Sequence, residues 1–183
     1  MKNINNIVLI GMPACGKSVT GVVLAKALRM KFIDTDLLIQ ERAGKGLQEI
    51  IDQDGIEIFK EMEREVLCSM DVSNAVIATG GSAVYYDDAM KHLAKDSIVL
   101  YIEIDLQGVK NRLRNIKTRG VAMSKGQTLD DLYEQRVPLY EKYADLNVRS
   151  DRNSMERTVD EMIRQLKEAD DRRDGKTGDH DER

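Results

Sequence analysis

The chain has 183 residues, of which 42% are hydrophobic and 33% charged, a composition typical of one globular domain rather than a fibrous or disordered chain. Its net charge of −4 argues against nucleic acid as the main partner, because proteins that grip a phosphate backbone usually carry a basic excess. No apolar run approaches the ~20 residues of a membrane span, and two cysteines make no disulfide framework, so we expect a cytoplasmic protein without a membrane partner.

The N-terminal part of the chain alternates between short apolar runs and helical patterns. Asn6 to Ile10 (NIVLI) predicts a strand buried on both faces, and Lys31 to Asp34 predicts a second strand. Apolar residues at helical spacing predict helices at Lys17 to Met30, at Thr35 to Arg42, and at Leu47 to Met70, where Gly55 breaks the segment into two.

The C-terminal part continues the alternation. Strands are expected at Ala75 to Thr79, Ser97 to Ile104 and Ala144 to Arg149, and helices at Leu106 to Ile116, Thr128 to Tyr143 and Ser154 to Ala169. Residues 117–127 are basic and glycine-containing and predict a mobile loop, whereas 170–183 hold no aliphatic or aromatic residue and predict a disordered tail. We therefore expect a single domain over 1–169, an α/β fold of three layers in which helices cover both faces of a parallel sheet of about five strands.

A phosphate-binding motif follows the first predicted strand. Gly11 to Ser18 reads GMPACGKS, which fits GxxxxGK[ST] between a strand and a helix. In this motif backbone N–H groups and the helix N-terminus face phosphate, the lysine contacts the β- and γ-phosphates, and the serine hydroxyl binds Mg²⁺. Cys15 is open to two interpretations, a small filler or a thiol activated by the helix N-terminus. The expected ATP-binding residues are Gly11, Met12, Pro13, Ala14, Cys15, Gly16, Lys17, Ser18 and Val19.

Four further segments carry a resemblance to a known family. They read FIDTD from Phe32, DGIEIFKEMEREVL from Asp54, ATGGSAV from Ala78 and QRVPLYEKYAD from Gln135. In order and spacing these segments and the phosphate loop closely resemble the shikimate kinases, from about Asn6 to Arg149. The resemblance implies a P-loop kinase fold, a monomer, and ATP and Mg²⁺ as co-substrate and metal. It also implies a small hydroxyl-bearing, carboxylate-containing substrate, with shikimate as the first expectation.

The resemblance also implies roles for individual residues. Lys17, Asp36 and Arg119 are expected in catalysis, with Asp36 holding the substrate hydroxyl and Arg119 closing over the transferring phosphate from the loop at 117–127. Ser18 and Asp34 are expected at the metal, and Arg112 against adenine. For Asp34 and Asp36 a helix N-cap is the structural alternative. The expected substrate-binding residues are Asp36, Lys60, Gly80, Gly81, Ser82 and Arg136.

Three positions depart from the family pattern. Lys60 stands where an arginine is typical, Ser82 where a third glycine is typical, and Arg119 is followed by glycine instead of proline. Two of these changes concern substrate contacts and one concerns the loop. A related kinase for another hydroxy acid or polyol, and a nucleotide-binding module without turnover, therefore remain as alternatives to shikimate phosphorylation.

Overall fold

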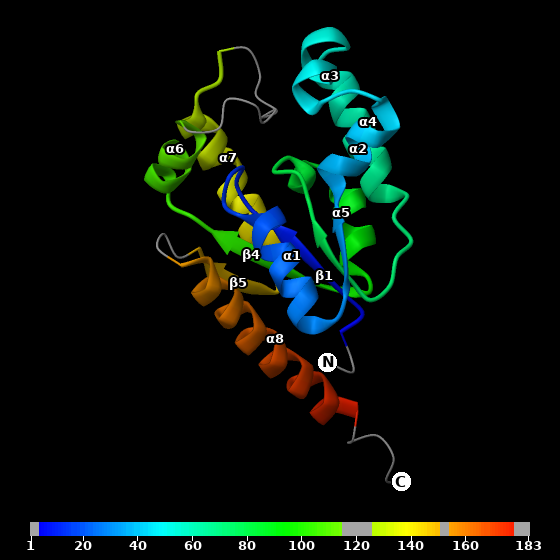
Figure 1. Cartoon of the computed structure of the whole chain (residues 1–183), viewed down its shortest axis with the longest axis vertical. Helices are drawn as coiled ribbons and strands as arrows, with labels where there is room; N and C mark the ends of the chain where they lie inside the picture. Colours follow the sequence, from blue (N-terminus) through cyan, green and yellow to red (C-terminus); the bar gives the residue numbers. More distant parts are fainter. Residues whose placement is uncertain (1–3, 115–125, 151–153, 178–183) are drawn as a thin grey trace.

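The computed structural model of the chain describes residues 4–114, 126–150 and 154–177 (Figure 1). Within these ranges, five parallel strands form one sheet in the order β2-β3-β1-β4-β5. They are β1 (Asn6–Ile10), β2 (Lys31–Asp34), β3 (Ala75–Ala78), β4 (Ser97–Glu103) and β5 (Leu146–Arg149). Central β1 has β3 on one side and β4 on the other, which creates the kind of switch point at which open α/β sheets bind ligands beyond the carboxyl ends of the strands.

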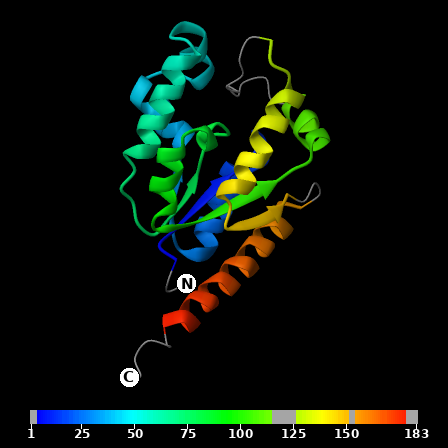
Figure 2. The same cartoon turned by 180° about the vertical axis from the view of Figure 1, so that it is seen from behind.

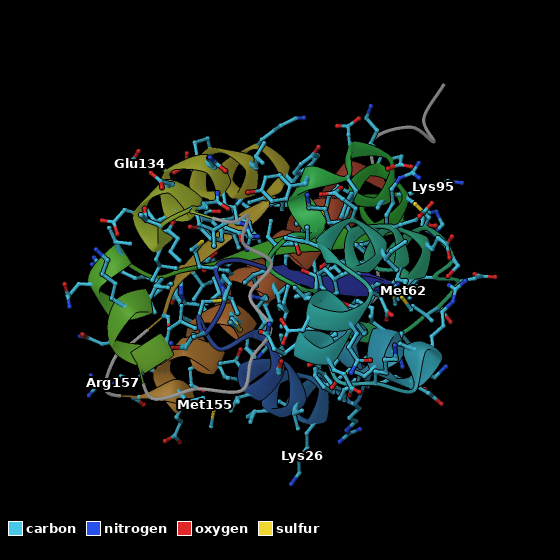
Figure 3. The ribbon with its side chains drawn as sticks, turned by 90° about the horizontal axis from the view of Figure 1, so that it is seen from above. Lys26, Met62, Lys95, Glu134, Met155 and Arg157 are labelled. Carbon is cyan, nitrogen blue, oxygen red and sulfur yellow. The ribbon has the colours of Figure 1, made fainter. Side chains whose placement is uncertain are left out.

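Helices cover both faces of the sheet. One face carries α1 (Lys17–Leu28) and α8 (Met155–Thr177), and the other carries α5 (Asp87–Ala94) and α7 (Leu129–Tyr143) (Figures 1 and 2). The view from above shows the sheet between these two layers (Figure 3). The predicted three-layer α/β fold is therefore confirmed. None of the helices in the described ranges is long and apolar enough to cross a membrane.

Three helices stand together at one end of the molecule. They are α2 (Thr35–Ala43), α3 (Leu47–Gln53) and α4 (Ile56–Cys68), which gather on the side of β2 and β3 (Figure 1). A small apolar cluster of their own holds them together, formed by the buried side chains of Ile39, Ile50, Phe59 and Val66. The main core lies separately, around β1, β3 and β4, whose side chains are almost completely buried. Across the sheet from this group, on the side of β4, α6 (Leu106–Arg114) contacts α7 (Figure 1).

The structure differs from the predicted elements in two segments. The last helix continues to Thr177, and Asp170 is only 9% exposed, so the expected disordered tail was wrong for residues 170–177. Residues 178–183 and most of the predicted loop at 117–127, including Arg119, lie outside the described ranges. A short 3₁₀ helix η1 (Ala83–Tyr85) and α5 follow β3, in a segment for which the sequence analysis predicts no element.

Candidate active site

The phosphate loop joins β1 to α1 through unusual backbone geometry. Gly11 has φ 143°, and a Cβ there would lie 2.7 Å from the carbonyl oxygen of Ile102 in β4. Gly16 has φ 114° and forms the N-cap of α1. Glycine is required at both positions, because these positive φ values disfavour any residue with a Cβ, and at Gly11 a Cβ would also collide with the backbone carbonyl. The loop is thereby fixed against the sheet, with the positive end of α1 directed at the space above it.

Two basic side chains contact the phosphate loop from different directions. Lys17 is 8% exposed, and its Nζ donates hydrogen bonds to the carbonyl oxygens of Gly11 at 2.7 Å and Met12 at 3.0 Å. Arg112, from α6, donates to the carbonyl oxygens of Ala14 at 3.1 Å and Cys15 at 2.9 Å. Lys17 therefore lies inside the loop and Arg112 against its outer side.

Cys15 packs into the core instead of facing solvent. The side chain is 1% exposed, belongs to the main apolar cluster, and lies against Gly11. Its Sγ also accepts a long contact of 3.6 Å from Lys17 Nζ. Burial of this kind favours the small-filler interpretation over a reactive thiol, which needs access to solvent.

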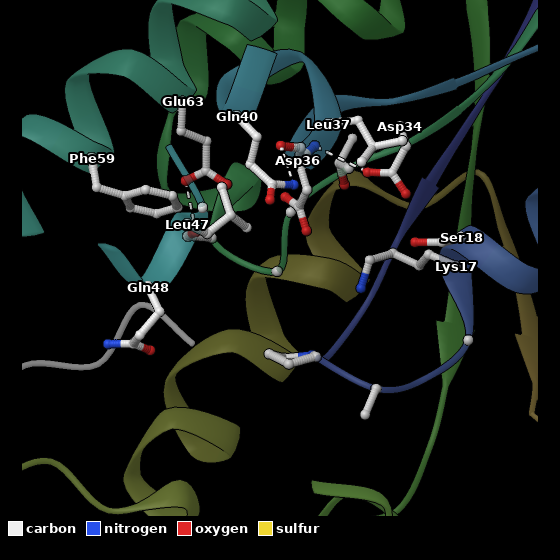
Figure 4. Close-up of a pocket in the computed structure, with 18 of the residues that line it drawn as sticks. Lys17, Ser18, Asp34, Asp36, Leu37, Gln40, Leu47, Gln48, Phe59 and Glu63 are labelled. Carbon is white, nitrogen blue, oxygen red and sulfur yellow. Dashed lines mark hydrogen bonds between the residues drawn. The ribbon is translucent and has the colours of Figure 1, made fainter. Parts of the chain in front are cut away.

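The two aspartates lie where β2 passes directly into α2. Asp34 is the N-cap of α2, and its Oδ1 accepts the backbone N–H of Asp36 at 3.0 Å. Asp34 is therefore a helix N-cap, the structural alternative given above, and it fixes the start of α2. Asp36 sits in the first turn, and its side chain points into the same space as Lys17 (Figure 4).

The turn after β3 is held by hydrogen bonds to residues of three other elements, β1, α2 and α7. Thr79 Oγ1 donates to the carbonyl oxygen of Leu9 at 2.9 Å, and the Gly80 N–H donates to Thr35 Oγ1 at 3.2 Å. The carbonyl oxygen of Gly81 accepts the hydroxyl of Tyr140, in α7, at 2.6 Å. The close approach of Gly80 and Gly81 to their surroundings explains why the turn carries two glycines.

Arg136 reaches this turn from α7. The side chain is 1% exposed, its Nε donates to the Tyr85 hydroxyl at 3.2 Å, and its guanidinium carbon lies 5.2 Å from the centroid of the Tyr85 ring. A Cβ on Gly81 would lie 3.0 Å from Arg136 Nη1. The guanidinium therefore lies beside the glycine turn, where a substrate carboxylate could meet it.

One cavity of about 520 Å³ collects most of the predicted site residues. It lies between the phosphate loop and the α2–α4 group, with Lys17 and Ser18 on one side and Asp34 and Asp36 on the other (Figure 4). The predicted residues that line it are Pro13, Ala14, Gly16, Lys17, Ser18, Asp34, Asp36, Gly80, Gly81, Ser82 and Arg136. The lining also includes residues that the sequence analysis does not single out, namely Leu37, Gln40, Gly46, Leu47, Gln48, Glu49, Phe59, Glu63 and Thr79.

The other predicted residues lie elsewhere. Met12 is buried in the core, and Val19 is 52% exposed on α1. Gly11 and Cys15 belong to the loop and Arg112 contacts the loop from α6, but none of these three lines the cavity. Lys60 lines a neighbouring cavity of about 250 Å³, and its Nζ pairs with Glu57 at 2.8 Å. Phe59 and Glu63, four residues apart, share the helix face that meets the main cavity, so the adjacent Lys60 is turned about 100° away from it.

Glu63 is a functional candidate that the sequence analysis leaves out of its site list. It is completely buried and lines the cavity, and burial raises its pKa from 4.5 to about 7, with Asp36 as a further cause. Its signal in the sequence is positional. It occupies the buried face of α4 with Phe59, Val66 and Leu67, where a carboxylate is unexpected unless it has a use.

Comparison with known proteins places this geometry in context. A protein-family model described as Shikimate kinase matches residues 13–167. A shikimate kinase of Vibrio cholerae serotype O1 is 34% identical over 166 residues, covering 89% of this chain and 95% of the relative. A shikimate kinase of a Sulfurihydrogenibium species is 30% identical over 163 residues, covering 88% and 98% of the two chains.

Solved structures give the same result at the level of the fold. The shikimate kinase from Acinetobacter baumannii, solved in complex with shikimate, superimposes with a TM-score of 0.82 at 25% identity, covering 92% of this chain and 96% of the other. The shikimate kinase from Aquifex aeolicus gives a TM-score of 0.74 at 29% identity, covering 88% and 96%. Both similarities therefore extend over most of this chain.

Proposed function

This chain belongs to the shikimate kinase family, and on that premise we propose that it transfers the γ-phosphoryl group of ATP to a hydroxyl of shikimate, giving shikimate 3-phosphate. The observation that carries the proposal is the convergence of a phosphate-binding lysine, a carboxylate and a buried arginine on one cavity, through Lys17, Asp36 and Arg136. One group can bind phosphate, one a hydroxyl and one a carboxylate, and these are the three functions that the two substrates require. We also propose a cytoplasmic monomer with no nucleic-acid partner, which the net charge of −4 supports.

The residues of the chain divide the reaction between them. Asp36 accepts a hydrogen bond from the substrate hydroxyl and orients it for in-line attack on the γ-phosphorus. Arg136 forms two parallel hydrogen bonds with the substrate carboxylate. Lys17 exchanges its bonds to the loop carbonyls for bonds to phosphate oxygens and stabilises the charge that develops there. Arg119, for which the family resemblance is the only support, adds a second positive charge at the transferring phosphate.

We propose Ser18 and Asp34 as the residues that hold Mg²⁺. The donor chemistry fits, because Mg²⁺ prefers oxygen ligands and usually takes only one or two from the protein, the others coming from water and phosphate. Both side chains line the same cavity as Lys17. Within the described ranges no group of three or more His, Cys, Asp or Glu forms a larger metal cage. When bound, the ion neutralises charge on the β- and γ-phosphates.

A kinase for another hydroxy acid is kept as a second candidate for one reason. Lys60, the residue at the position where the family has an arginine for the substrate carboxylate, pairs with Glu57 and lines the smaller cavity. Of the basic side chains of α4 and α7, Arg136 is the one that lines the main cavity. A nucleotide-binding module without turnover fits less well, since Lys17, Ser18, Asp34 and Asp36 all line one cavity.

Steady-state kinetics with a coupled ADP-release assay test the proposal. We expect wild type to release ADP in the presence of ATP, Mg²⁺ and shikimate. Lys17→Ala should lower kcat by at least ~100-fold, because it removes a charge that acts on the transition state. Asp36→Asn should retain ATP binding and lose turnover. Lys26→Ala, an exposed lysine on the same helix, is the matched control and should behave as wild type (Figure 3).

Each other outcome has a defined meaning. Turnover of a different member of a hydroxy-acid panel, with none of shikimate, would contradict the acceptor and leave the phosphoryl transfer intact. ATP binding without turnover of any member would contradict the enzyme. Near wild-type activity of Lys17→Ala would contradict the assignment of the phosphate loop.

A further inference from the structure

The buried carboxylate of Glu63 has an asymmetric environment. Its Oε2 accepts two hydrogen bonds, from Ser82 Oγ at 2.6 Å and from the Tyr86 hydroxyl at 3.0 Å. Its Oε1 is buried and has no hydrogen-bond partner among the described residues. A buried carboxylate oxygen without a partner is costly, so its retention in a cavity wall indicates a partner that arrives from outside the chain.

The unpartnered oxygen lies next to the proposed catalytic carboxylate. A Cβ on Gly80 would overlap Glu63 Oε1 and would lie 3.0 Å from Asp36 Oδ1, so the two oxygens flank the same glycine. Glu63 and Asp36 belong to different helices, α4 and α2, and both side chains reach Gly80 in this turn. Glu63 therefore presents an acceptor beside the one that we assign to the reacting hydroxyl.

Ser82 has the geometry of a residue that fixes this arrangement. It is 4% exposed and precedes η1 in a helical backbone conformation, with φ −91°. Its hydroxyl is directed at Glu63 and gives the shorter of the two hydrogen bonds to Oε2. Glycine at this position would leave Glu63 with the Tyr86 hydroxyl as its one donor among those that the structure shows. The two donors restrict rotation of the carboxyl group, so Oε2 stays occupied and Oε1 stays beside Gly80 and Asp36 Oδ1.

We infer that Ser82 is a positioning residue for the acceptor: its hydroxyl, together with that of Tyr86, holds Glu63 so that Oε1 accepts a hydrogen bond from the hydroxyl-rich substrate beside Asp36. Ser82 then acts through Glu63 and does not itself contact the substrate. This inference deepens the proposed function and rests on it for its kinetic consequences, but the hydrogen bond itself can be tested without any turnover.

The charges around Glu63 define the expected pH effect. The pKa of Glu63 is raised to about 7 as the net result of opposing causes: burial, the largest, and Asp36 raise it, whereas the hydrogen bonds from Ser82 and Tyr86 and the charge of Arg136 lower it. Burial and Glu63 also raise the pKa of Tyr86, which therefore remains a donor throughout the neutral range. Since both hydroxyls stabilise the ionised carboxylate, removal of either one must raise the pKa of Glu63.

Direct titration of Glu63 by NMR, with ¹³C-labelled glutamate in the full-length protein without ligands, tests the positioning role. We expect Ser82→Ala to raise the pKa of Glu63 by about one unit, the usual effect of losing one hydrogen bond to a charged group. Ser82→Thr, which keeps the hydroxyl, should return the pKa toward that of wild type. Ser97→Ala is the matched control, because Ser97 is 5% exposed and lies at the amino end of β4, away from the cavity.

Kinetics on the same variants test the consequence for the acceptor. The acidic limb of the pH profile of kcat/KM for shikimate should move upward by about one pH unit in Ser82→Ala and return in Ser82→Thr. The KM for ATP should not change. If Ser82→Ala does not fold, Tyr86→Phe removes the second donor without a cavity and should move the pKa of Glu63 in the same direction.

The inference is overturned if the pKa of Glu63 is unchanged in folded Ser82→Ala or, where that variant does not fold, in Tyr86→Phe. It is also overturned if that pKa shifts while the pH profile and the KM for shikimate stay as in wild type. Failure of the proposed function would look different, because wild type would then leave shikimate unphosphorylated while the NMR titration still responded to Ser82→Ala.

Discussion

At the scale of single residues, the helix α4 places one carboxyl group where its neighbours are apolar. Phe59, Val66 and Leu67 are buried on the same face of α4 as Glu63. Burial makes ionisation of Glu63 unfavourable, and two hydroxyls only partly compensate. A group whose pKa is higher in the folded chain than in the unfolded one makes stability depend on pH.

We expect the free energy of unfolding to fall as the pH rises from about 4.5 to above 7, because the folded chain binds more protons in that interval. Glu63 accounts for a loss of up to about 3 kcal/mol. Glu63→Gln cannot ionise and should remove most of this decrease. Urea unfolding at pH 5 and pH 8 measures it, and Glu61→Gln, an exposed glutamate of the same helix, should leave the decrease in place. An equal decrease in wild type and Glu63→Gln would assign the pH dependence to other groups.

At the scale of elements, the last helix α8 is a structural part of the domain. Val159, Met162 and Leu166 are buried along one side of it, and the spacing of three and four residues forms a continuous stripe against α1 and β5. Asp170 continues the stripe at the next position four residues on and is also buried. The helix therefore continues beyond its last apolar residue, because the side that carries Leu166 is still buried at Asp170.

Leu166→Ala should lower the free energy of unfolding by about 2–5 kcal/mol, since it empties a completely buried position. Lys167→Ala, at the next and exposed position, should change it by less than about 0.5 kcal/mol. Thermal or urea unfolding of the two variants gives the comparison. Similar small effects in both would mean that α8 does not pack on the sheet in solution.

At the scale of the whole molecule, the two apolar clusters predict two levels of stability. The strands of the main core are buried, whereas α3 has seven residues and buries only Ile50. Short helices with few buried contacts open at a lower free energy than central strands. We expect the amides of α3 to exchange with solvent well before those of β1 and β4.

Hydrogen exchange followed by mass spectrometry measures this difference. Because Gly46 to Glu49 line the cavity at the start of α3, ATP and shikimate together should slow exchange in α3. Exchange in β5, which does not line the cavity, is the internal control and should respond less. Equal protection of α3 and β1 without ligands would contradict the two-level interpretation.

The sequence predicts the parts of this molecule that depend on local patterns. The boundaries of β2 agree with the prediction, and the helix predicted from Thr128 begins there, with Thr128 as the N-cap of α7 in a capping box, because both follow from neighbouring residues. The sequence predicts no element at α5, because this helix has eight residues and only three of them are buried, Ala89, Met90 and Leu93. Short helices of this kind carry a weak periodic signal.

The site is divided in the same way between local and tertiary information. The phosphate loop and the aspartates of β2 and α2 lie within continuous motifs, and so their convergence on one cavity was expected. The contact between Ser82 and Glu63 joins residues 19 positions apart and depends on how α4 crosses the turn after β3. The direction of Lys60 depends on the same crossing, which no local pattern specifies.

The separate cluster under α2, α3 and α4 has a consequence for how this enzyme class can diversify. Ile39, Ile50, Phe59 and Val66 support the cavity wall to which we assign the acceptor, while the phosphate loop rests on the main core. Substitutions in the small cluster can reshape that wall without disturbing the nucleotide end of the cavity. A laboratory library restricted to α2–α4 should therefore yield variants with new acceptors that keep the wild-type KM for ATP. Natural selection can change acceptor specificity by the same route.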